Sequence, residues 1–396
     1  MNDFKINGFR AAAVRSGIRG KDRLDMGLIV CDRPAVAAGV FTTSQVKAAP
    51  VLLDMERLAD GKARALLVNS GIANACSGAA GMAAAISSSK LVGDGLEISE
   101  DDVLVASTGV IGEQLDLACF EKGIPALIES LSTDGLAEVS QAIMTTDTVA
   151  KTAVRVVEVA GKPVKLVGMA KGAGMIKPNM ATMLAFVMTD VAIEHGCLQH
   201  MLRQACDRSF NRITIDGDTS TNDSVLILAN GLAANQPLTE NSPDSAPFMA
   251  ALHDLTKDLA LQIVRDGEGA TKLVTVRVKG ARNDQEAKQA AETVAESNLV
   301  KTAFFGEDAN WGRIIGALGR SGAAFDQQQV DISFDEVLMV ENGLGLGREV
   351  EAAATEVLKK KEFNVNIDLK AGAGFCEYYT CDFSLDYVRI NADYRT

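Results

Sequence analysis

Short runs of branched apolar residues alternate with helical stretches along the whole chain. Eight of these runs have the length and composition of β-strands: Met26–Cys31, Ala65–Asn69, Val103–Ser107, Ala153–Val159, Leu184–Thr189, Ser224–Ala229, Leu273–Val278 and Phe363–Leu369. Val274, Val276 and Val278 alternate strictly with polar residues, which is typical of a strand with one buried face. The pattern predicts an α/β (α+β) layered sandwich, in which helices pack on sheets.

Two stretches have helical periodicity. Ala246–Val264 carries an apolar stripe from Phe248 to Ile263, and Asp284–Ser297 carries a narrower stripe beneath a charged face. We expect both to cover sheets. The segment Gln236–Pro247 holds two prolines and several small polar residues, so it is expected to be a surface loop. No repeat or low-complexity tract marks a boundary, and 396 residues suffice for one large or two ordinary domains.

Composition narrows the class of ligand. The formal net charge of -13 argues against a nucleic-acid-binding surface, which draws chiefly on clustered Lys and Arg. A small-molecule substrate is therefore expected, with no nucleic acid and no membrane as partner. Met1 is followed by polar residues and by no long apolar stretch, which predicts neither a signal peptide nor a spanning helix. We accordingly expect a cytoplasmic protein.

The residues that commonly bind metals or act as catalytic bases are few, and their spacing matches no known site. Seven scattered cysteines without a CxxC pair indicate reduced, packed thiols, and the three histidines form no metal-ligand spacing. The segment Asp216–Ile227 fails as a calcium loop because Thr221 and Ile227 stand where Gly and Glu are required. The glycines of Gly343–Gly347 lack the spacing of a dinucleotide-binding turn. We expect no metal, no cofactor and a catalytic base other than histidine.

The most unusual segment is Gly168–Asp190, GMAKGAGMIKPNMATMLAFVMTD, in which a glycine-rich loop leads directly into an apolar strand. A Thr hydroxyl at such a strand start can attack the preceding carbonyl, convert the amide into an ester and let water release a new N-terminus. The freed α-amine of Thr182 can then act as general base for its own hydroxyl. Taken alone, Thr182 is better explained as an ordinary β-forming residue.

A family resemblance favours the chemical interpretation. The segment KGAGMIKPNMATML resembles the cleavage motif of the ornithine acetyltransferase family, the bifunctional glutamate N-acetyltransferases of arginine biosynthesis. Further segments similar to that family follow in family order: VNSGIANACSG (68–78), ASTGVIGEQL (106–115), IMTTDT (143–148), RSFNRITIDGDTSTNDS (208–224), FGEDANWGRI (305–314) and NADYRT (391–396). The resemblance implies cleavage between Ala181 and Thr182, giving an α chain 1–181 and a β chain 182–396.

The resemblance also implies roles for individual residues. Thr108 and Gly109 are expected to form the oxyanion hole. The residues that match the family's substrate contacts are Thr145, Lys171, Thr182, Glu268, Asn391 and Thr396. Thr146 is an alternative to Thr145, because the register of that match is hard to fix. Lys171 and the C-terminal residues would receive a carboxylate or acetyl oxygen, and Glu268 would pair with a substrate ammonium group.

The activity implied is a ping-pong transfer of the acetyl group from N-acetylornithine to glutamate through an acetyl-Thr182 intermediate. The family also implies a second activity, the acetylation of glutamate from acetyl-CoA, and we expect this chain to have it. The implied fold is the DmpA/ornithine-acetyltransferase-like fold, which resembles N-terminal-nucleophile hydrolases, and the implied assembly is a heterotetramer of two α and two β chains. The alternatives are a self-processing amidase or aminopeptidase, and an amino-acid-binding protein that never cleaves itself.

Overall fold

The computed structural model describes residues 4–20, 22–177 and 183–393. They divide into two compact units, which we call unit 1 (residues 4–211 and 218–263) and unit 2 (residues 212–217 and 264–393). The helix α6 (Ser245–Arg265) runs across the boundary between residues 263 and 264. This position explains why the sequence shows no linker there, since an amphipathic helix carries none of the Gly, Pro or polar clustering of a domain boundary.

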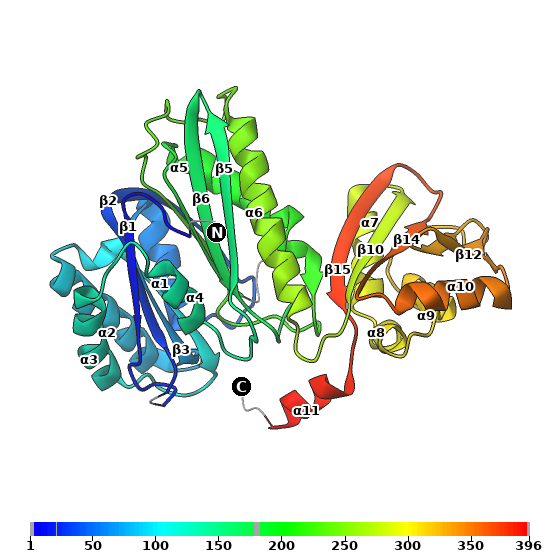
Figure 1. Ribbon diagram of the computed structural model, residues 1–396, viewed down its shortest axis with the longest axis horizontal. Coiled ribbons are helices and arrows are strands. Elements are labelled where there is room, and N and C mark those ends of the chain that lie inside the picture. Colours follow the sequence, from blue (N-terminus) through cyan, green and yellow to red (C-terminus); the bar gives the residue numbers. More distant parts are fainter. Residues whose placement is uncertain (1–3, 21, 178–182, 394–396) are drawn as a thin grey trace. The chain divides into compact units, whose positions relative to one another are not determined.

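Unit 1 is built on eight paired strands (Figure 1). Their order is β4-β3-β2-β9-β7-β6-β5, with β1 beside β2. The bounds are β1 Phe9–Val14, β2 Met26–Phe41, β3 Lys62–Ile72, β4 Val103–Val110, β5 Lys151–Val159, β6 Lys162–Lys171, β7 Leu184–Thr189 and β9 Ser224–Ala229. Because β3 and β4 are parallel, as are β7 and β9, two pairs of strands end at shared sheet edges.

The long strand β2 divides the strands of unit 1 into two layers. Its first half pairs with β1 and β3, its second half pairs with β9, and its register against β3 shifts between Val30 and Ala35. One hydrophobic cluster holds Leu104 and Ala106 of β4 together with Val167 and Met169 of β6. The β4 and β6 layers therefore face each other, and their shared apolar interface stabilises unit 1.

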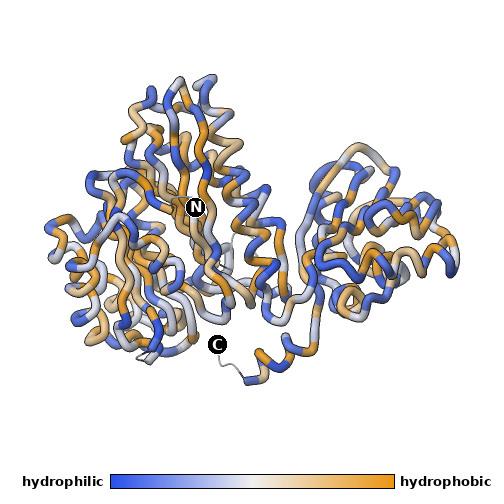
Figure 2. Tube along the Cα trace, in the orientation of Figure 1, coloured by the Kyte–Doolittle hydropathy of each residue, from blue (hydrophilic) through white to orange (hydrophobic). Residues whose placement is uncertain are grey.

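Helices cover both outer faces of these layers. Next to β3 and β4 lie α1 (Ala49–Arg57), α2 (Gly78–Leu96) and α3 (Leu117–Glu129), whose apolar residues share a second cluster with the outward side chains of those strands. On the other side, a Cβ added to Gly168 of β6 would lie 2.7 Å from Leu255 of α6, so this helix packs directly on the strand. Hydrophobic residues concentrate on the strands, whereas α6 alternates apolar and polar positions (Figure 2).

The remaining helices of unit 1 close the sandwich. Gln199 of α5 (His195–Arg208) exchanges two hydrogen bonds with the backbone of Gly39 on β2. The short helix α4 (Leu136–Ala142) inserts Leu136 and Val139 into the cluster between the layers. Unit 1 is thus a helix, sheet, sheet, helix arrangement, and the predicted layered sandwich is confirmed.

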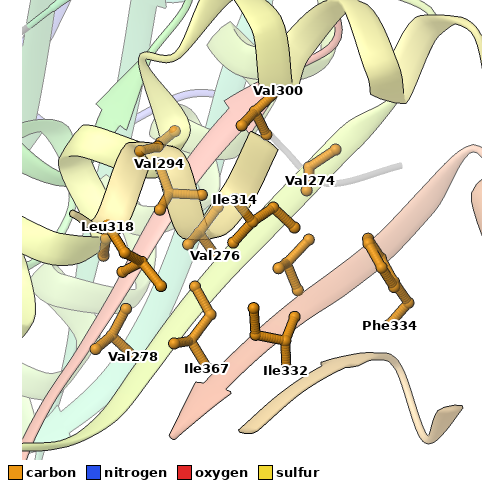
Figure 3. Packing of buried hydrophobic residues seen from close by; sticks show 14 of the residues in the cluster. Val274, Val276, Val278, Val294, Val300, Ile314, Leu318, Ile332, Phe334 and Ile367 are labelled. Atoms are coloured by element: carbon orange, nitrogen blue, oxygen red, sulfur yellow. The ribbon is translucent and has the colours of Figure 1, made fainter. Parts of the chain in front are cut away.

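Unit 2 contains a second mixed sheet, ordered β13-β12-β11-β14-β10-β15-β8. Its strands are β8 Ile213–Thr214, β10 Leu273–Ala281, β11 Asp331–Phe334, β12 Val337–Glu341, β13 Leu344–Gly345, β14 Glu362–Asp368 and β15 Gly374–Cys381. Its helices are α7 Asp284–Ala295, α8 Asn298–Phe305, α9 Trp311–Leu318, α10 Arg348–Leu358 and α11 Leu385–Asp393. Alternate residues of β10 and β14, such as Val276 and Ile367, pack under α7 and α9 (Figure 3).

All eight predicted strands are present, and both predicted helices are confirmed within two residues at each end. The predicted loop is also confirmed up to residue 244, after which α6 begins at Ser245. All seven cysteines are free, and only Cys76 is exposed. Within the described ranges there is no group of three or more His, Cys, Asp or Glu placed to hold a metal ion. Among the helices described, none is long and apolar enough to cross a membrane.

Candidate functional site in unit 1

Thr108 and Lys171 meet because each continues the inward-facing series of its strand. Strand β4 turns Leu104 and Ala106 toward the opposite layer, and Thr108 is the next residue with the same parity. Strand β6 turns Val167 and Met169 inward, and Lys171 follows them at its last position. Lys171 Nζ donates a hydrogen bond of 3.2 Å to Thr108 Oγ1. Two motifs 63 residues apart are thereby joined across the sandwich.

The backbone beside Thr108 is held in a conformation that suits glycine. Gly109 has a φ of 134°, and a Cβ placed on it would lie 2.2 Å from the carbonyl carbon of Gly71 on β3. These two glycines are register partners in the parallel pair β3 and β4. A side chain at position 109 would force the strands apart, so the close approach that orients the Thr108–Gly109 backbone requires Gly.

Asn222 fixes the end of β4 just before Thr108. Its Nδ2 donates to the carbonyl oxygen of Ser107 at 2.8 Å and to that of Ala73 at 2.5 Å. The Ser107 hydroxyl in turn donates to Asn69 Oδ1 at 2.7 Å. Asn222 and Ser107 are both buried, and so the oxyanion-hole candidates stand on a rigid polar support.

A buried carboxylate lies behind Lys171. Asp147 Oδ1 accepts hydrogen bonds from Lys151 Nζ and from the backbone N–H of Gly172, both at 2.6 Å, and Oδ2 accepts from the N–H of Thr145 at 2.9 Å. The side chains of Asp147 and Lys151 are fully buried. Burial acts to raise the pKa of the Asp147 carboxyl, but the nearby ammonium groups of Lys171 and Lys151 more than offset it and lower that pKa to about 2.

Thr145 lies in a segment held from two sides. Its N–H is bound by Asp147, and its carbonyl oxygen accepts from Arg19 Nη2 at 3.3 Å, while Arg19 also donates to the carbonyl oxygen of Met144. The Arg19 backbone is anchored by the carboxylate of Asp25. The structure therefore brings Thr145 beside Asp147 and the end of β6 that carries Lys171.

A second buried carboxyl lies at the start of β7. Asp223 is 1% exposed and accepts a hydrogen bond from the backbone N–H of Met183. Burial raises the pKa of this carboxyl well above its usual range, against the opposing effects of that N–H and of Lys171. Within the described part of the chain, Asp223 Oδ2 has no hydrogen-bond partner. A carboxyl in this environment favours its neutral form.

The predicted cleavage residues Ala181 and Thr182 lie outside the described residues, as does Thr396. The neighbouring Met183 is described, and its carbonyl oxygen accepts from the N–H of Ser224 at 3.1 Å. Leu184 pairs with Lys171 in the β6 and β7 ladder and faces the interior of the sandwich. The strand that begins two residues after Thr182 is thus paired with the strand that carries Lys171.

Glu268 and Asn391 meet in unit 2. Asn391 Nδ2, on α11, donates a hydrogen bond of 2.7 Å to Glu268 Oε2. The loop of Glu268 is tied to the residues before that helix, since the hydroxyl of Ser384 donates to the carbonyl oxygen of Gly269 at 2.6 Å. Glu268 is 8% exposed, so its carboxylate is largely removed from bulk water. Two residues matched to the family's substrate contacts are therefore neighbours within this unit.

Unit 2 also has an open hollow of about 750 Å³ that contains none of the predicted site residues. It is lined by Arg282, Gly319, Ala323, Ala324, Phe325, Asp326, Gln327 and Ala371. We therefore do not assign the proposed chemistry to this hollow.

Comparison with known proteins identifies the family of this chain. A sequence model of the ArgJ family matches residues 10–396. The chain belongs to the ArgJ family. Relatives include the arginine biosynthesis bifunctional protein ArgJ of Desulfotalea psychrophila, 57% identical over 392 residues, and that of Geobacter sulfurreducens, 52% identical over 391 residues. Each alignment covers 99% of this chain and 100% of the relative.

A solved member of the ArgJ family has a related fold. The crystal structure of the arginine biosynthesis bifunctional protein ArgJ from Bacillus halodurans matches with a TM-score of 0.52 at 48% sequence identity. The match covers 54% of this chain and 100% of that chain. The predicted membership of the family is thereby confirmed.

Sequence reasoning did not single out three residues that the structure places beside the site: Asp147, Asn222 and Asp223. Each lies inside a family-like segment, IMTTDT or RSFNRITIDGDTSTNDS. The only local signal was a polar residue one to four positions before a strand start, at 151 or 224. Their burial and their partners depend on contacts that are distant in sequence.

Proposed function

We propose that this ArgJ-family chain is an arginine-biosynthesis enzyme that cleaves itself before Thr182 and transfers the acetyl group of N-acetylornithine to glutamate. The observation that carries the proposal is the 3.2 Å hydrogen bond from Lys171 Nζ to Thr108 Oγ1. It joins the segment that precedes the proposed cleavage point to the segment proposed to form the oxyanion hole. Such a convergence of a hydroxyl, a cation and a glycine backbone suits acyl transfer.

In the first proposed reaction, the hydroxyl of Thr182 attacks the carbonyl carbon of Ala181 and displaces the amide nitrogen. Water then hydrolyses the ester, leaving a carboxyl group on Ala181 and a free α-amine on Thr182. Leu184 faces the interior between the layers, and residues two apart in a strand share a face. This inward-facing start of β7 is paired with the end of β6, the strand that carries Lys171.

In the second proposed reaction, the Thr182 α-amine takes the proton of the hydroxyl, which attacks the acetyl carbonyl of N-acetylornithine. Thr108 and the backbone N–H of Gly109 hold the developing oxyanion, and the positive charge of Lys171 stabilises it. Ornithine leaves with the proton, and the α-amine of glutamate then takes the acetyl group from Thr182. Donors of this kind contribute about 2.7–4 kcal/mol each in well-studied acyl transfer.

The finer features belong to the same proposal. Glu268, which Asn391 orients, would pair with an ammonium group of the substrate, and Thr145 and Thr396 are proposed as further substrate contacts. Acetyl-CoA is proposed as an additional acetyl donor, and a heterotetramer of two α and two β chains as the assembly. A cytoplasmic location and the absence of a metal or other cofactor complete the proposal.

Denaturing electrophoresis with N-terminal sequencing tests the proposal. Two bands are expected, the second beginning TMLAFVM, together with acetyl transfer from N-acetylornithine to glutamate. A single intact band that persists on incubation would contradict self-cleavage. Cleavage combined with steady release of acetate without glutamate would instead support the amidase alternative. An intact chain that binds amino acids but transfers nothing would support the binding-protein alternative.

A further inference from the structure

One carboxylate connects three segments of unit 1. Two of them lie on either side of it in the sequence, and the third is 25 residues away. Asp147 accepts hydrogen bonds from Thr145 N, from Gly172 N and from Lys151 Nζ. Gly172 directly follows Lys171 at the end of β6, and Lys151 is the first residue of β5. The carboxylate thus spans the loop that carries Thr145 and the ends of two strands.

The charges around this carboxylate favour a fixed geometry. Two ammonium groups, those of Lys151 and Lys171, act on the single negative charge of Asp147. Lys151 is fully buried, so its ammonium group would be costly without a counter-ion, and like charges in a medium of low dielectric repel strongly. The four-carbon side chain of Lys171 has several rotamers, and the field of Asp147 favours those near Thr108.

We propose that Asp147 is a positioning residue that holds Lys171 Nζ beside Thr108 and fixes the Thr145 segment against the end of β6. The inference rests on the proposed acetyl transfer at this site. Asp147 itself contacts neither the proposed oxyanion nor the acetyl group, and it acts through Lys171, Gly172 and Thr145. A displacement of about 1 Å at a reacting centre can lower a rate about 10²-fold.

Asp147→Asn is the direct test, because it keeps the size of the side chain and removes its charge. Acetyl transfer is expected to fall about 10²-fold in kcat/KM, together with stability, since Lys151 loses its counter-ion. The double variant Asp147→Asn with Lys151→Met removes both buried charges. We expect it to recover most of the melting temperature while kcat/KM stays about 10²-fold low.

The control is Asp94→Asn on α2, since Asp94 and Lys90 form another pair with four-residue spacing but on the surface. It should leave kcat/KM and melting temperature unchanged. A double variant that regained both stability and wild-type kcat/KM would overturn the positioning role and leave Asp147 a purely structural residue. A wild-type protein without acetyl transfer would instead contradict the proposed function.

Hydrogen–deuterium exchange gives a readout that does not depend on activity. In the wild-type protein the amides of Thr145 and Gly172 are expected to exchange slowly, because Asp147 binds both. In the double variant both amides should exchange faster, while the amide of Val105, bound by Asp54, keeps its rate. Fast exchange of Thr145 and Gly172 in the wild type, or unchanged slow exchange in the double variant, would contradict the proposal.

Discussion

The two units use their polar side chains differently. In unit 1 the sheet layers are covered on both faces, so a charged group that points inward must find its partner inside, as Asp147 does with Lys151 at 2.6 Å. In unit 2, strands β10 and β14 alternate buried and partly exposed residues, and pairs such as Arg277 and Glu377 lie on the more exposed side of the sheet. Charge alone therefore does not mark a site, since both units contain ion pairs, and a buried charge cluster at converging strand ends is the stronger indication of one.

The comparison predicts its largest effect at the proposed nucleophile. Thr182→Ala removes the hydroxyl that attacks in both proposed reactions, so self-cleavage and acetyl transfer are both expected to disappear. Denaturing electrophoresis and an acetyl-transfer assay measure the two losses. Thr182→Ser, which keeps a hydroxyl, is the matched variant and should still cleave and transfer. An Ala variant that transfers at the wild-type rate would identify another nucleophile.

The next effect is expected at Thr108. Thr108→Val keeps the shape of the side chain and removes the hydroxyl that receives the hydrogen bond from Lys171. We expect kcat to fall by about 10²–10³-fold, the usual cost of one oxyanion-hole donor, with little change in melting temperature. Thr293→Val, on α7 of unit 2, removes a hydroxyl that donates to the carbonyl oxygen of Gln289. This control should leave kcat unchanged; an equal loss in both variants would argue against a special role for Thr108.

A third, smaller effect concerns pH. Burial raises the pKa of Asp223 in the folded state, so the unfolded chain ionises at this residue first as pH rises above the ordinary value of 3.8. The free energy of unfolding therefore falls with rising pH, by at most about 1.4 kcal/mol per pH unit, until the folded-state pKa is passed. Asp223→Asn removes this contribution, and denaturant titrations at several pH values measure the difference. If the stability of the wild type relative to the variant rose with pH in this range, the pKa of Asp223 would be lowered in the folded state and not raised.

The smallest effect is expected for the surface pair of unit 2. Arg277→Met removes the partner of Glu377 on the side of the sheet where these side chains are 42% and 22% exposed. Pairs of this kind contribute about 0.2–1 kcal/mol to stability. The free energy of unfolding, measured with denaturant, should therefore fall by at most about 1 kcal/mol, and the rate of acetyl transfer should not change. A loss of stability above about 3 kcal/mol is typical of breaking a buried pair. Such a loss would contradict the difference proposed between the ion pairs of the two units.

The sequence was sufficient for eight of the strands and for the family motifs that carry the proposed site residues. Leu184–Thr189 and Ser224–Ala229 were predicted with their observed ends, because both strands are buried on both faces and read as continuous apolar runs. Strand β6 was missed, since KPVKLVGMAK begins with charged residues and a proline. Thr108 and Lys171 came from family motifs, and the structure brings them together.

The pairing of β2 and the surroundings of the buried carboxyl groups depend on contacts between residues far apart in sequence, so no local pattern predicts them. The division of β2 into two halves that serve different layers depends on pairing with β3 and β9, so only the first half was predicted. Asp147 and Asp223 look like ordinary loop carboxylates in the sequence. Their opposite pKa shifts arise from different surroundings, two ammonium groups for Asp147 and dominant burial for Asp223.

The most direct test of the account is to trap the covalent intermediate. The purified protein would be incubated with N-acetylornithine in the absence of glutamate, quenched in acid, digested and mapped by mass spectrometry. An acetyl ester is expected on the hydroxyl of an N-terminal Thr182, and it should disappear when glutamate is added before the quench. An acetyl group found only on another residue, or an intact bond between Ala181 and Thr182 in an active enzyme, would contradict the central claim.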